Sequence, residues 1–479
     1  MIYKKLIFSF LFLICTQLSY SQYFDDLKRY VNENYSGSAR YNSMGGAFGS
    51  LGGEFSSISD NPASGAVFNY TQIGFSLKLN DEKNSVLYNN RNTKKESNDF
   101  DFNQFGVVFV LNNNSSSWSK LNFSFNYQLQ NIYNNKFSVK GSSNIGIDNY
   151  FLNYAQGVDL SNLKLNDNET ISGLYQFLGS SPNLGFGAQQ AFLGYQGYIV
   201  NPFSNTNDNN NYLTNAKYSN NLNQELYLNS SGDNKKSSFN VSGFYKNNLY
   251  VGLNINSYEI NYSETRDFYE DNYDFESNLR SLQFRNNLKT FGKGTSIQIG
   301  IIALLKNNFR LGISYHSPIW YKFFEESSQY LITSHKIDEI FYEDTVDPNT
   351  INVYPEYKLK IPSKLSGSIS YVFNKKGIIS FEFTTQNISS ANFSNNINNS
   401  FTDLNNEVNS SSKTKTTIKT GFEYRLYDSV SLRGGFLNQS SYVKSYSNGL
   451  NAISFGVGFN FGYSFLDVSI QKFNLKDSK

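Results

Sequence analysis

The sequence predicts an all-β fold, an antiparallel transmembrane β-barrel, and three observations favour it. Short segments repeatedly alternate apolar and polar residues, and 17% of the chain is aromatic. The links between these segments are either tight turns or long polar loops, as in bacterial outer-membrane barrels. The long loops are predicted near 80–103, 263–280, 324–356, 387–412 and 438–450. No later stretch approaches the ~18 consecutive apolar residues of a transmembrane helix. A soluble β-sandwich also alternates, but its loops would not sort by length so regularly.

Residues 1–21 are predicted to be a cleaved signal peptide. Two lysines precede a short apolar run at 6–14, and small residues precede Gln22 at the expected cleavage point. Cys15 is the only cysteine, and Ile14 stands where a lipoprotein signal would place a small residue. The mature chain should therefore contain no cysteine, and disulfides do not hold it together.

The alternation identifies individual strands. In "LNFSFNYQL", which begins at Leu121, the odd positions are apolar and the even ones polar, over the ~9–11 residues of a membrane-spanning strand. About thirteen such strands are predicted, near 71–79, 104–111, 121–131, 238–245, 249–262, 281–305, 309–323, 364–373, 378–386, 414–426, 430–437, 451–461 and 465–474. Single-chain bacterial barrels have an even number. Either a strand is missed or merged, or the last one is absent.

The longest link, at about 133–236, is unusual because its middle is apolar and aromatic. The segment "ISGLYQFLGSSPNLGFGAQQAFLGYQGYIV" carries apolar residues at helical spacing. It either packs on the barrel rim as a lid or receives a hydrophobic ligand. In the second case the candidate contacts are Leu174, Phe177, Leu178, Phe186 and Phe192.

Enzyme chemistry and nucleic-acid binding are not expected. The net charge is +2 and no basic face stands out. Of the two histidines, His316 is predicted to face the lumen beside Ser314, but nothing in the sequence supplies a third, orienting group. We find no P-loop, zinc-ligand spacing or CxxC, so no catalytic residue, metal or cofactor is predicted.

Four cationic residues fall on the polar faces of predicted strands, here called wet faces, which should line the lumen. In a lumen they could attract a carboxylate, or they could pair with lumen acids such as Glu382, Glu423 and Asp467. The four are Arg310, Lys419, Arg425 and Arg433.

The segment before the first strand carries a resemblance to a known family. "ARYNSMGGAFGSLGGEFSSISDNPA", from Ala39 to Ala63, resembles the N-terminal segment of the FadL/TodX outer-membrane transport proteins. Three later segments, 310–319, 361–373 and 427–473, are similar to that family as well. The resemblance covers most of the mature chain.

This resemblance implies a fourteen-stranded barrel, here 71–479 with an extracellular insertion at about 133–236, and an N-terminal hatch, 22–70, inside the lumen. It also implies that this chain lacks the closing strand. Glycines would let the hatch backbone turn tightly, and an Asn-Pro-Ala motif would fix its direction before the first strand. The implied gating residues are Gly45, Gly46, Gly49, Gly52, Gly53, Asn61, Pro62 and Ala63.

The function implied by the resemblance is passive transport across the outer membrane of a Gram-negative bacterium. The cargo would be hydrophobic small molecules such as long-chain fatty acids, and the chain would act as a monomer among outer-membrane lipids. Two alternatives stay open: a general porin for hydrophilic solutes, and a component of an outer-membrane protein secretion machine.

Overall fold

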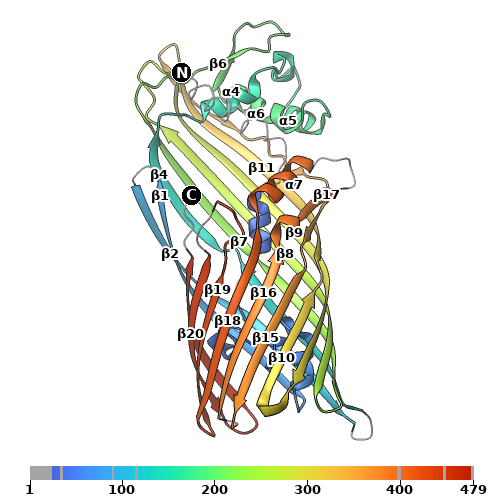
Figure 1. Ribbon diagram of the computed structural model, residues 1–479. Helices are drawn as coiled ribbons and strands as arrows, with labels where there is room; N and C mark the ends of the chain where they lie inside the picture. The colour runs from blue at the N-terminus through green and yellow to red at the C-terminus, as the bar shows by residue number, and fades with distance from the viewer. Residues whose placement is uncertain are drawn as a thin grey trace, which may run out of the picture.

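One antiparallel sheet rolls into a barrel in the computed structural model of the chain (Figure 1). The structure describes residues 24–32, 36–88, 91–113, 117–374, 376–395, 401–445 and 449–475. The predicted signal peptide at 1–21 lies outside the described residues.

In the described part of the chain, thirteen wall strands, here called staves, follow one another round the barrel in chain order, each antiparallel to its neighbours, and two of the staves consist of two consecutive β-strands. They are β1 (Gln72–Tyr88), β2 (Arg91–Asn112), β3 (Trp118–Ile132), β7 (Leu222–Tyr245), β8 (Leu249–Asp271), β9 (Leu279–Leu304), β10 with β11 (Phe309–His316 and Ile319–Ile337), β14 with β15 (Tyr357–Ile361 and Lys364–Phe373), β16 (Gly377–Asn387), β18 (Thr414–Tyr427), β19 (Val430–Gln439), β20 (Leu450–Asn460) and β21 (Phe465–Leu475). Each predicted strand corresponds to one stave. Within the described residues β1 and β21 share no ladder, and the expected fourteenth strand is not among them.

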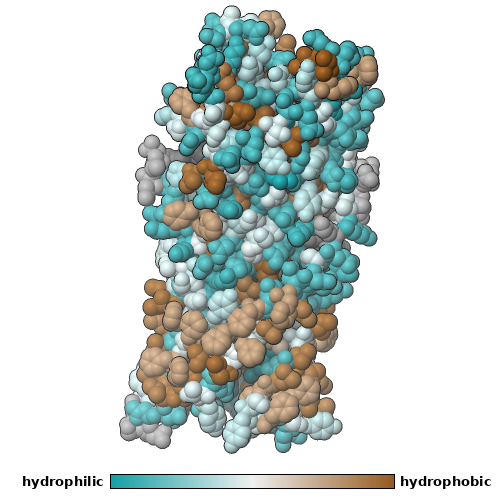
Figure 2. All heavy atoms as spheres, turned by 180° about the vertical axis from the view of Figure 1, so that it is seen from behind, coloured by the Kyte–Doolittle hydropathy of each residue, from teal (hydrophilic) through white to brown (hydrophobic). Residues whose placement is uncertain are grey.

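An apolar belt surrounds one end of the barrel. On β9 the outward side chains of Ile297, Ile299 and Ile301 are exposed, and the inward ones between them are polar or absent. Figure 2 shows this belt as a brown band, with a mostly polar surface beyond it. Tight turns join the staves at the belt end, so the barrel crosses a bilayer there. No helix in the described part of the chain is long and apolar enough to cross a membrane.

The staves extend well past the belt, and three predicted loops are wrong for this reason. The ranges 80–103, 263–280 and 324–356, predicted to be polar loops, are largely strand. They include the ends of β1, β8 and β11, together with the short strands β12 (Ile340–Val346) and β13 (Asn352–Val353). Beyond the belt the outer face meets water, so the apolar-out alternation that reveals a membrane strand is lost.

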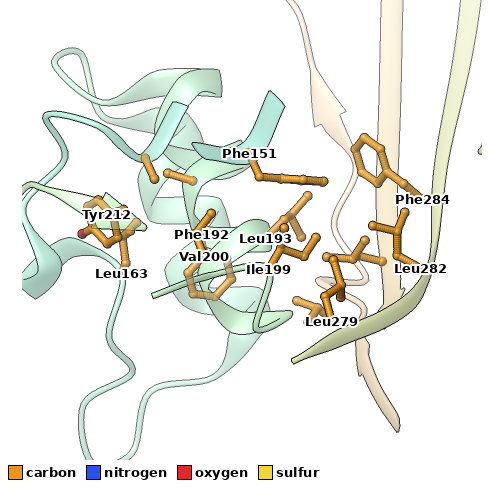
Figure 3. Packing of buried hydrophobic residues seen from close by; sticks show 14 of the residues in the cluster. Phe151, Leu163, Phe192, Leu193, Ile199, Val200, Tyr212, Leu279, Leu282 and Phe284 are labelled. Carbon is orange, nitrogen blue, oxygen red and sulfur yellow. The ribbon is translucent and has the colours of Figure 1, made fainter. Parts of the chain in front are cut away.

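A cap of small helices covers the outer end, the end opposite the tight turns. Within the range 133–236 the chain forms β4 (Asn135–Ser143) and the start of β7, and the cap itself is residues 144–221. It contains α4 (Asp148–Ala155), η3 (Leu160–Asn162), α5 (Ile171–Ser180), α6 (Gly185–Gln196), β5 (Val200–Pro202) and β6 (Tyr212–Thr214). Figure 3 shows cap side chains such as Phe151 and Leu193 packed against Leu282 and Phe284 of β9.

The N-terminal segment lies inside the barrel. At the level of the belt, residues 36–68, here called the plug, form α3 (Ala39–Ser43), η1 (Ser56–Ser59) and η2 (Pro62–Val67). Above them lies α2 (Phe24–Val31), close to α7 (Thr402–Ser411) (Figure 1). The remaining short elements are η4 (Lys306–Asn308), η5 (Ile388–Ser390) and β17 (Asn392–Asn395).

Candidate functional site

The plug rests on wall positions that have no side chain. A Cβ added at Gly300 of β9 would collide with Asn61 Oδ1 and lie 2.8 Å from Pro62 Cδ. A Cβ added at Gly252 of β8 would collide with the Pro62 carbonyl. Glycine therefore allows two neighbouring staves to approach the plug backbone closely, which is the positional use of glycine inside a strand.

Amide side chains of the wall donate hydrogen bonds to plug carbonyls. Asn122 Nδ2 donates to Gly65 O at 2.7 Å, and Asn254 Nδ2 donates to Ile58 O at 2.7 Å. Gln298 Nε2 donates to Asp60 O, also at 2.7 Å. The irregular plug backbone cannot satisfy all its own carbonyls, so the amide-rich inner face supplies donors to groups that would otherwise be buried unpaired.

The glycines of the predicted hatch motif have two separate roles. Gly45, Gly46, Gly52 and Gly53 have φ between 61° and 72°, in the left-handed region that favours glycine. Gly49 instead donates its N–H to Glu382 Oε2 of β16 at 2.9 Å. The motif therefore combines tight turning with close contact to the wall.

The Asn-Pro-Ala motif starts η2 and holds it on the wall. Asn61 is the N-cap: its Oδ1 accepts from Ala63 N at 3.0 Å, and Pro62 takes the first helical position. Asn61 Nδ2 also donates to Gly49 O at 2.6 Å and to Ile301 O at 3.2 Å. One side chain thus connects two parts of the plug and a wall stave.

Two ion-pair groups bind the plug to the later staves. Lys419 of β18 lies 3.1 Å from Asp60 of the plug and 3.0 Å from Glu382. Arg40 of α3 lies 2.9 Å from Glu423, which also pairs with Arg433 at 2.6 Å. Removing one member of such a buried group leaves an unpaired charge, a change that typically costs about 3–5 kcal/mol.

A small polar cavity lies directly above the plug. All thirteen residues that line it are polar or charged, and they come from η1, the Asp60 turn and the inner faces of five staves. Three lysines, Lys364, Lys415 and Lys419, face two carboxylates, Asp60 and Glu382, so the cavity has an excess of positive charge.

His316 forms the upper wall of this cavity. Its Nε2 lies 3.0 Å from the Tyr258 hydroxyl and 3.1 Å from Ser296 Oγ. The partner serine is therefore Ser296 of the next stave and not the neighbouring Ser314. Among the described residues no group of three or more His, Cys, Asp or Glu side chains could hold a metal ion.

Above His316 the inner wall changes from polar to apolar. On β8 the inward residues change from Asn254 and Asn256 to Tyr258, Ile260 and Tyr262, all buried. Over the same length the outward face changes from exposed leucine and isoleucine to serine and glutamate. The amphipathicity of one stave therefore inverts where the barrel leaves the belt.

The helix α2 fills the apolar compartment, here called the apolar slot. Phe24, Leu27, Tyr30 and Val31 of α2 are buried there. The Tyr30 ring stacks on Phe323 at 4.4 Å. The slot is lined by aromatic and aliphatic residues of five elements: Tyr258, Ile260 and Tyr262 of β8, Tyr321 and Phe323 of β11, Tyr357 and Leu359 of β14, Phe393 of β17, and Phe401 and Val408 at α7.

The slot and the cavity are adjacent. Lys415, which lines the cavity, donates from Nζ to the Val31 carbonyl at the end of α2, at 3.3 Å. Tyr258 lines the slot and hydrogen-bonds His316 of the cavity. A cationic pocket therefore lies at the base of an apolar, aromatic compartment.

The three predicted lumen arginines lie apart from this pocket and from one another. Arg310 donates from Nη1 to the plug carbonyl of Leu51 at 2.9 Å. Arg433 lies between Glu423 and Asp467, at 2.6 and 2.5 Å, so its charge is neutralised. Arg425 lies exposed beside the tight turn of β18 and β19.

Most of the predicted cap contacts are core residues of the cap. Leu174, Leu178 and Phe192 are buried in its hydrophobic cluster, and Phe186 packs edge-on against Tyr154. Phe177 is 58% exposed. Of these five, Phe177 alone could meet a ligand without disturbing the cap.

Lys364 and Lys415 are absent from the predicted site residues, although a signal for them exists in the sequence. Lys364 precedes Ser366 on the wet face of one predicted strand, and Lys415 precedes Lys419 on that of another. Alternation places each residue on the correct face. It does not indicate which residues of different strands lie at the same height in the barrel, and those heights decide which side chains line the cavity.

Comparison with known proteins gives a distant likeness. No family model matches the chain, and no curated protein matches it. The toluene transporter TodX of Pseudomonas putida is 11% identical with a TM-score of 0.44, covering 92% of this chain and 93% of its own. The toluene transporter TbuX of Ralstonia pickettii is 12% identical with a TM-score of 0.44, covering 91% and 93%.

A FadL homologue of Pseudomonas aeruginosa is similar at 11% identity and a TM-score of 0.47, covering 92% of this chain and 89% of its own. These solved structures come from the family that the N-terminal motif resembles.

Proposed function

We propose that this chain is a passive outer-membrane channel for hydrophobic small molecules such as long-chain fatty acids, with its N-terminal segment as the gate. The observation that carries the proposal is the divided lumen. An apolar, aromatic slot lies above a small cavity with excess positive charge. An amphiphile with one anionic end matches both compartments, since apolar area drives its tail into the slot and lysines attract its carboxylate.

The ligand would enter at the outer end and compete with α2 for the slot. The helix presents Leu27 and Tyr30 to the same aromatic side chains that would contact an alkyl chain. Its own charged residues, such as Asp25 and Lys28, pair with each other on its exposed side. When an alkyl chain replaces α2, the apolar wall of the slot stays covered. Little apolar area is then newly exposed to water, so the displacement costs little free energy.

Passage past the belt would then require the plug to shift. Ion pairs and hydrogen bonds hold the plug to the wall, and the ion pair from Lys419 to Asp60 lies in the cavity itself. A carboxylate bound at Lys419 competes with Asp60 for the same ammonium group. Ligand binding would therefore weaken the contact that keeps the plug in place.

A general porin is the less favoured candidate. The plug occupies the lumen at the level of the belt, and wall side chains such as Asn240 and Asn254 donate directly to its backbone. A hydrophilic solute would therefore have to displace the plug, and its hydrogen bonds to the wall oppose that displacement.

Uptake by proteoliposomes tests the proposal, with labelled oleate and labelled glucose as the two cargoes. We expect oleate entry and no glucose entry. Lys364→Gln with Lys415→Gln should slow oleate entry, whereas Lys322→Gln, on the exposed outer wall, should not. Glucose entry would make the protein a porin, and equal oleate uptake with protein-free vesicles would reject the channel.

A further inference from the structure

The short strand β12 presents an unpaired edge at the outer end of the barrel. It pairs with β11 from Leu331 to Ile337, on the side of β11 away from β9. In the described part of the chain β11 is the only strand with a ladder to β12, and β13 pairs with β11 further along. The backbone N–H and C=O groups on the other side of β12 are therefore available to another strand.

Three common protective features of natural edges, namely lysine, proline and a β-bulge, are absent from this strand. Its ladder with β11 runs for seven residue pairs with no register shift, and its sequence, "IFYEDTV", contains neither lysine nor proline. Ile340, Phe341 and Tyr342 are exposed by 57%, 62% and 44%. Regular edges with exposed apolar side chains are the kind that recruit a further strand.

The edge is also held rigidly. Val346 at its end is buried in the core of the cap. The Tyr342 ring stacks on His335 at 5.7 Å, and His335 stacks on Tyr198 of the cap at 4.3 Å. A preformed edge loses little conformational freedom when a partner binds.

Charge on the hairpin selects the partner. Residues 338–347 include Asp338, Glu339, Glu343, Asp344 and Asp347 and no lysine or arginine. Beside the hairpin, Lys336 lies 3.2 Å from Glu339 and His335 lies 3.5 Å from Asp344. A second copy of this chain would place acids against acids, because its β12 carries the same residues.

We propose that the free edge of β12 binds an extended, basic segment of another protein by strand addition at the outer face. Main-chain hydrogen bonds supply the affinity, and alternating lysine or arginine side chains reach the acids. Phe275 and Phe341 flank Arg280, whose guanidinium lies 5.8 Å from each ring, and extend the apolar surface beside the hairpin. This site is independent of the proposed transport.

The test uses the full detergent-solubilised chain and a short, acetylated, labelled peptide of alternating lysine and valine. We expect binding that weakens with salt, together with slowed hydrogen exchange at 340–346. Glu343→Lys with Asp344→Lys should weaken binding by about tenfold or more. Asp428→Lys, in an exposed turn at the opposite end, is the matched control and should leave it unchanged.

Three results would overturn the proposal. They are no binding of the peptide, equal binding to the charge-reversed variant, and binding that leaves exchange at 340–346 unchanged. Sedimentation at increasing protein concentration tests the second-copy alternative, and self-association lost in the same variant would assign the edge to that contact.

Discussion

Gly300 is the position where a single methyl group tests the fit of plug and wall. Gly300→Ala adds a Cβ that collides with Asn61, so we expect overpacking of about 1–3 kcal/mol. The plug should separate from β9, and ion conductance through single channels in planar bilayers should rise. Gly367→Ala is the matched control, because nothing lies within 4 Å of its added Cβ. Equal conductance of the two variants would contradict the described contact.

At the residue scale, alternation in the sequence predicts the face of a side chain but not its partner. Arg433 and Lys419 both fall on predicted wet faces, and both face the lumen in the structure. Which acids they meet depends on strand register and on the path of the plug. The sequence reports neither, because register is a relation between strands distant in sequence.

At the scale of elements, α2 is the part whose removal should favour ligand. Leu27→Glu introduces a carboxylate into the apolar slot. Burying this charge among apolar side chains is unfavourable, so α2 should leave the slot. Because a competing occupant lowers the apparent affinity of the slot, we expect oleate to bind about tenfold more tightly or better, measured with radiolabelled oleate on the detergent-solubilised protein.

Asp25→Ala is the control for that change, since Asp25 lies on the exposed side of the same helix. Unchanged oleate affinity in Leu27→Glu, with α2 shown to be displaced by hydrogen exchange, would remove the helix from the gate.

Attachment of the cap should depend on pH. Burial raises the pKa of Asp148 and the pKa of Glu270, at the outer rim beyond the belt, above their ordinary values, although hydrogen bonds from Thr214 and Tyr273 oppose the shift. With folded pKa values above unfolded ones, their stabilisation is complete below about pH 4. It is lost as pH rises through the folded pKa values.

Hydrogen exchange of residues 148–155, corrected for the intrinsic rate, measures this dependence. We expect protection to fall as the pH rises above about 4, the ordinary carboxyl pKa. Asp148→Asn should flatten the profile, because an amide keeps hydrogen bonds with Thr214 and Tyr218 without a charge. Asp167→Asn, exposed on the same cap, should leave the profile as it is. Protection of residues 148–155 that rises with pH would contradict the predicted direction of the pH dependence.

Strands at belt height could be predicted from sequence, and the extensions of several strands above the belt could not. The range predicted for β8 ends at 262, whereas the strand continues to Asp271. Its alternation inverts near Tyr258, and a pattern based on one apolar outer face fails there. The position of α2 in the slot was likewise unpredictable, since eight residues with an apolar side fit many surfaces.

At the scale of the whole molecule, the transmembrane barrel follows from composition and loop lengths, and the divided lumen follows only from the packing. Thirteen staves, each carrying a wet and an apolar face, form the wall. The N-terminal segment fills the lumen at two heights, with polar contacts below and apolar contacts above. The proposed gate combines both, so its movement is the central claim.

A reversible disulfide between the plug and the wall tests that movement directly. A Cβ built on Gly49 lies 3.2 Å from Ser368 Cβ, close to the separation of a disulfide, so Gly49→Cys with Ser368→Cys links plug to wall. Ser370→Cys with Ser380→Cys joins the same two wall strands at a pair outside the cavity and is the control. In proteoliposomes we predict that the oxidised plug–wall pair blocks oleate entry, that reduction restores it, and that the wall pair has no effect. Undiminished oleate entry through the oxidised plug–wall protein would contradict a moving gate.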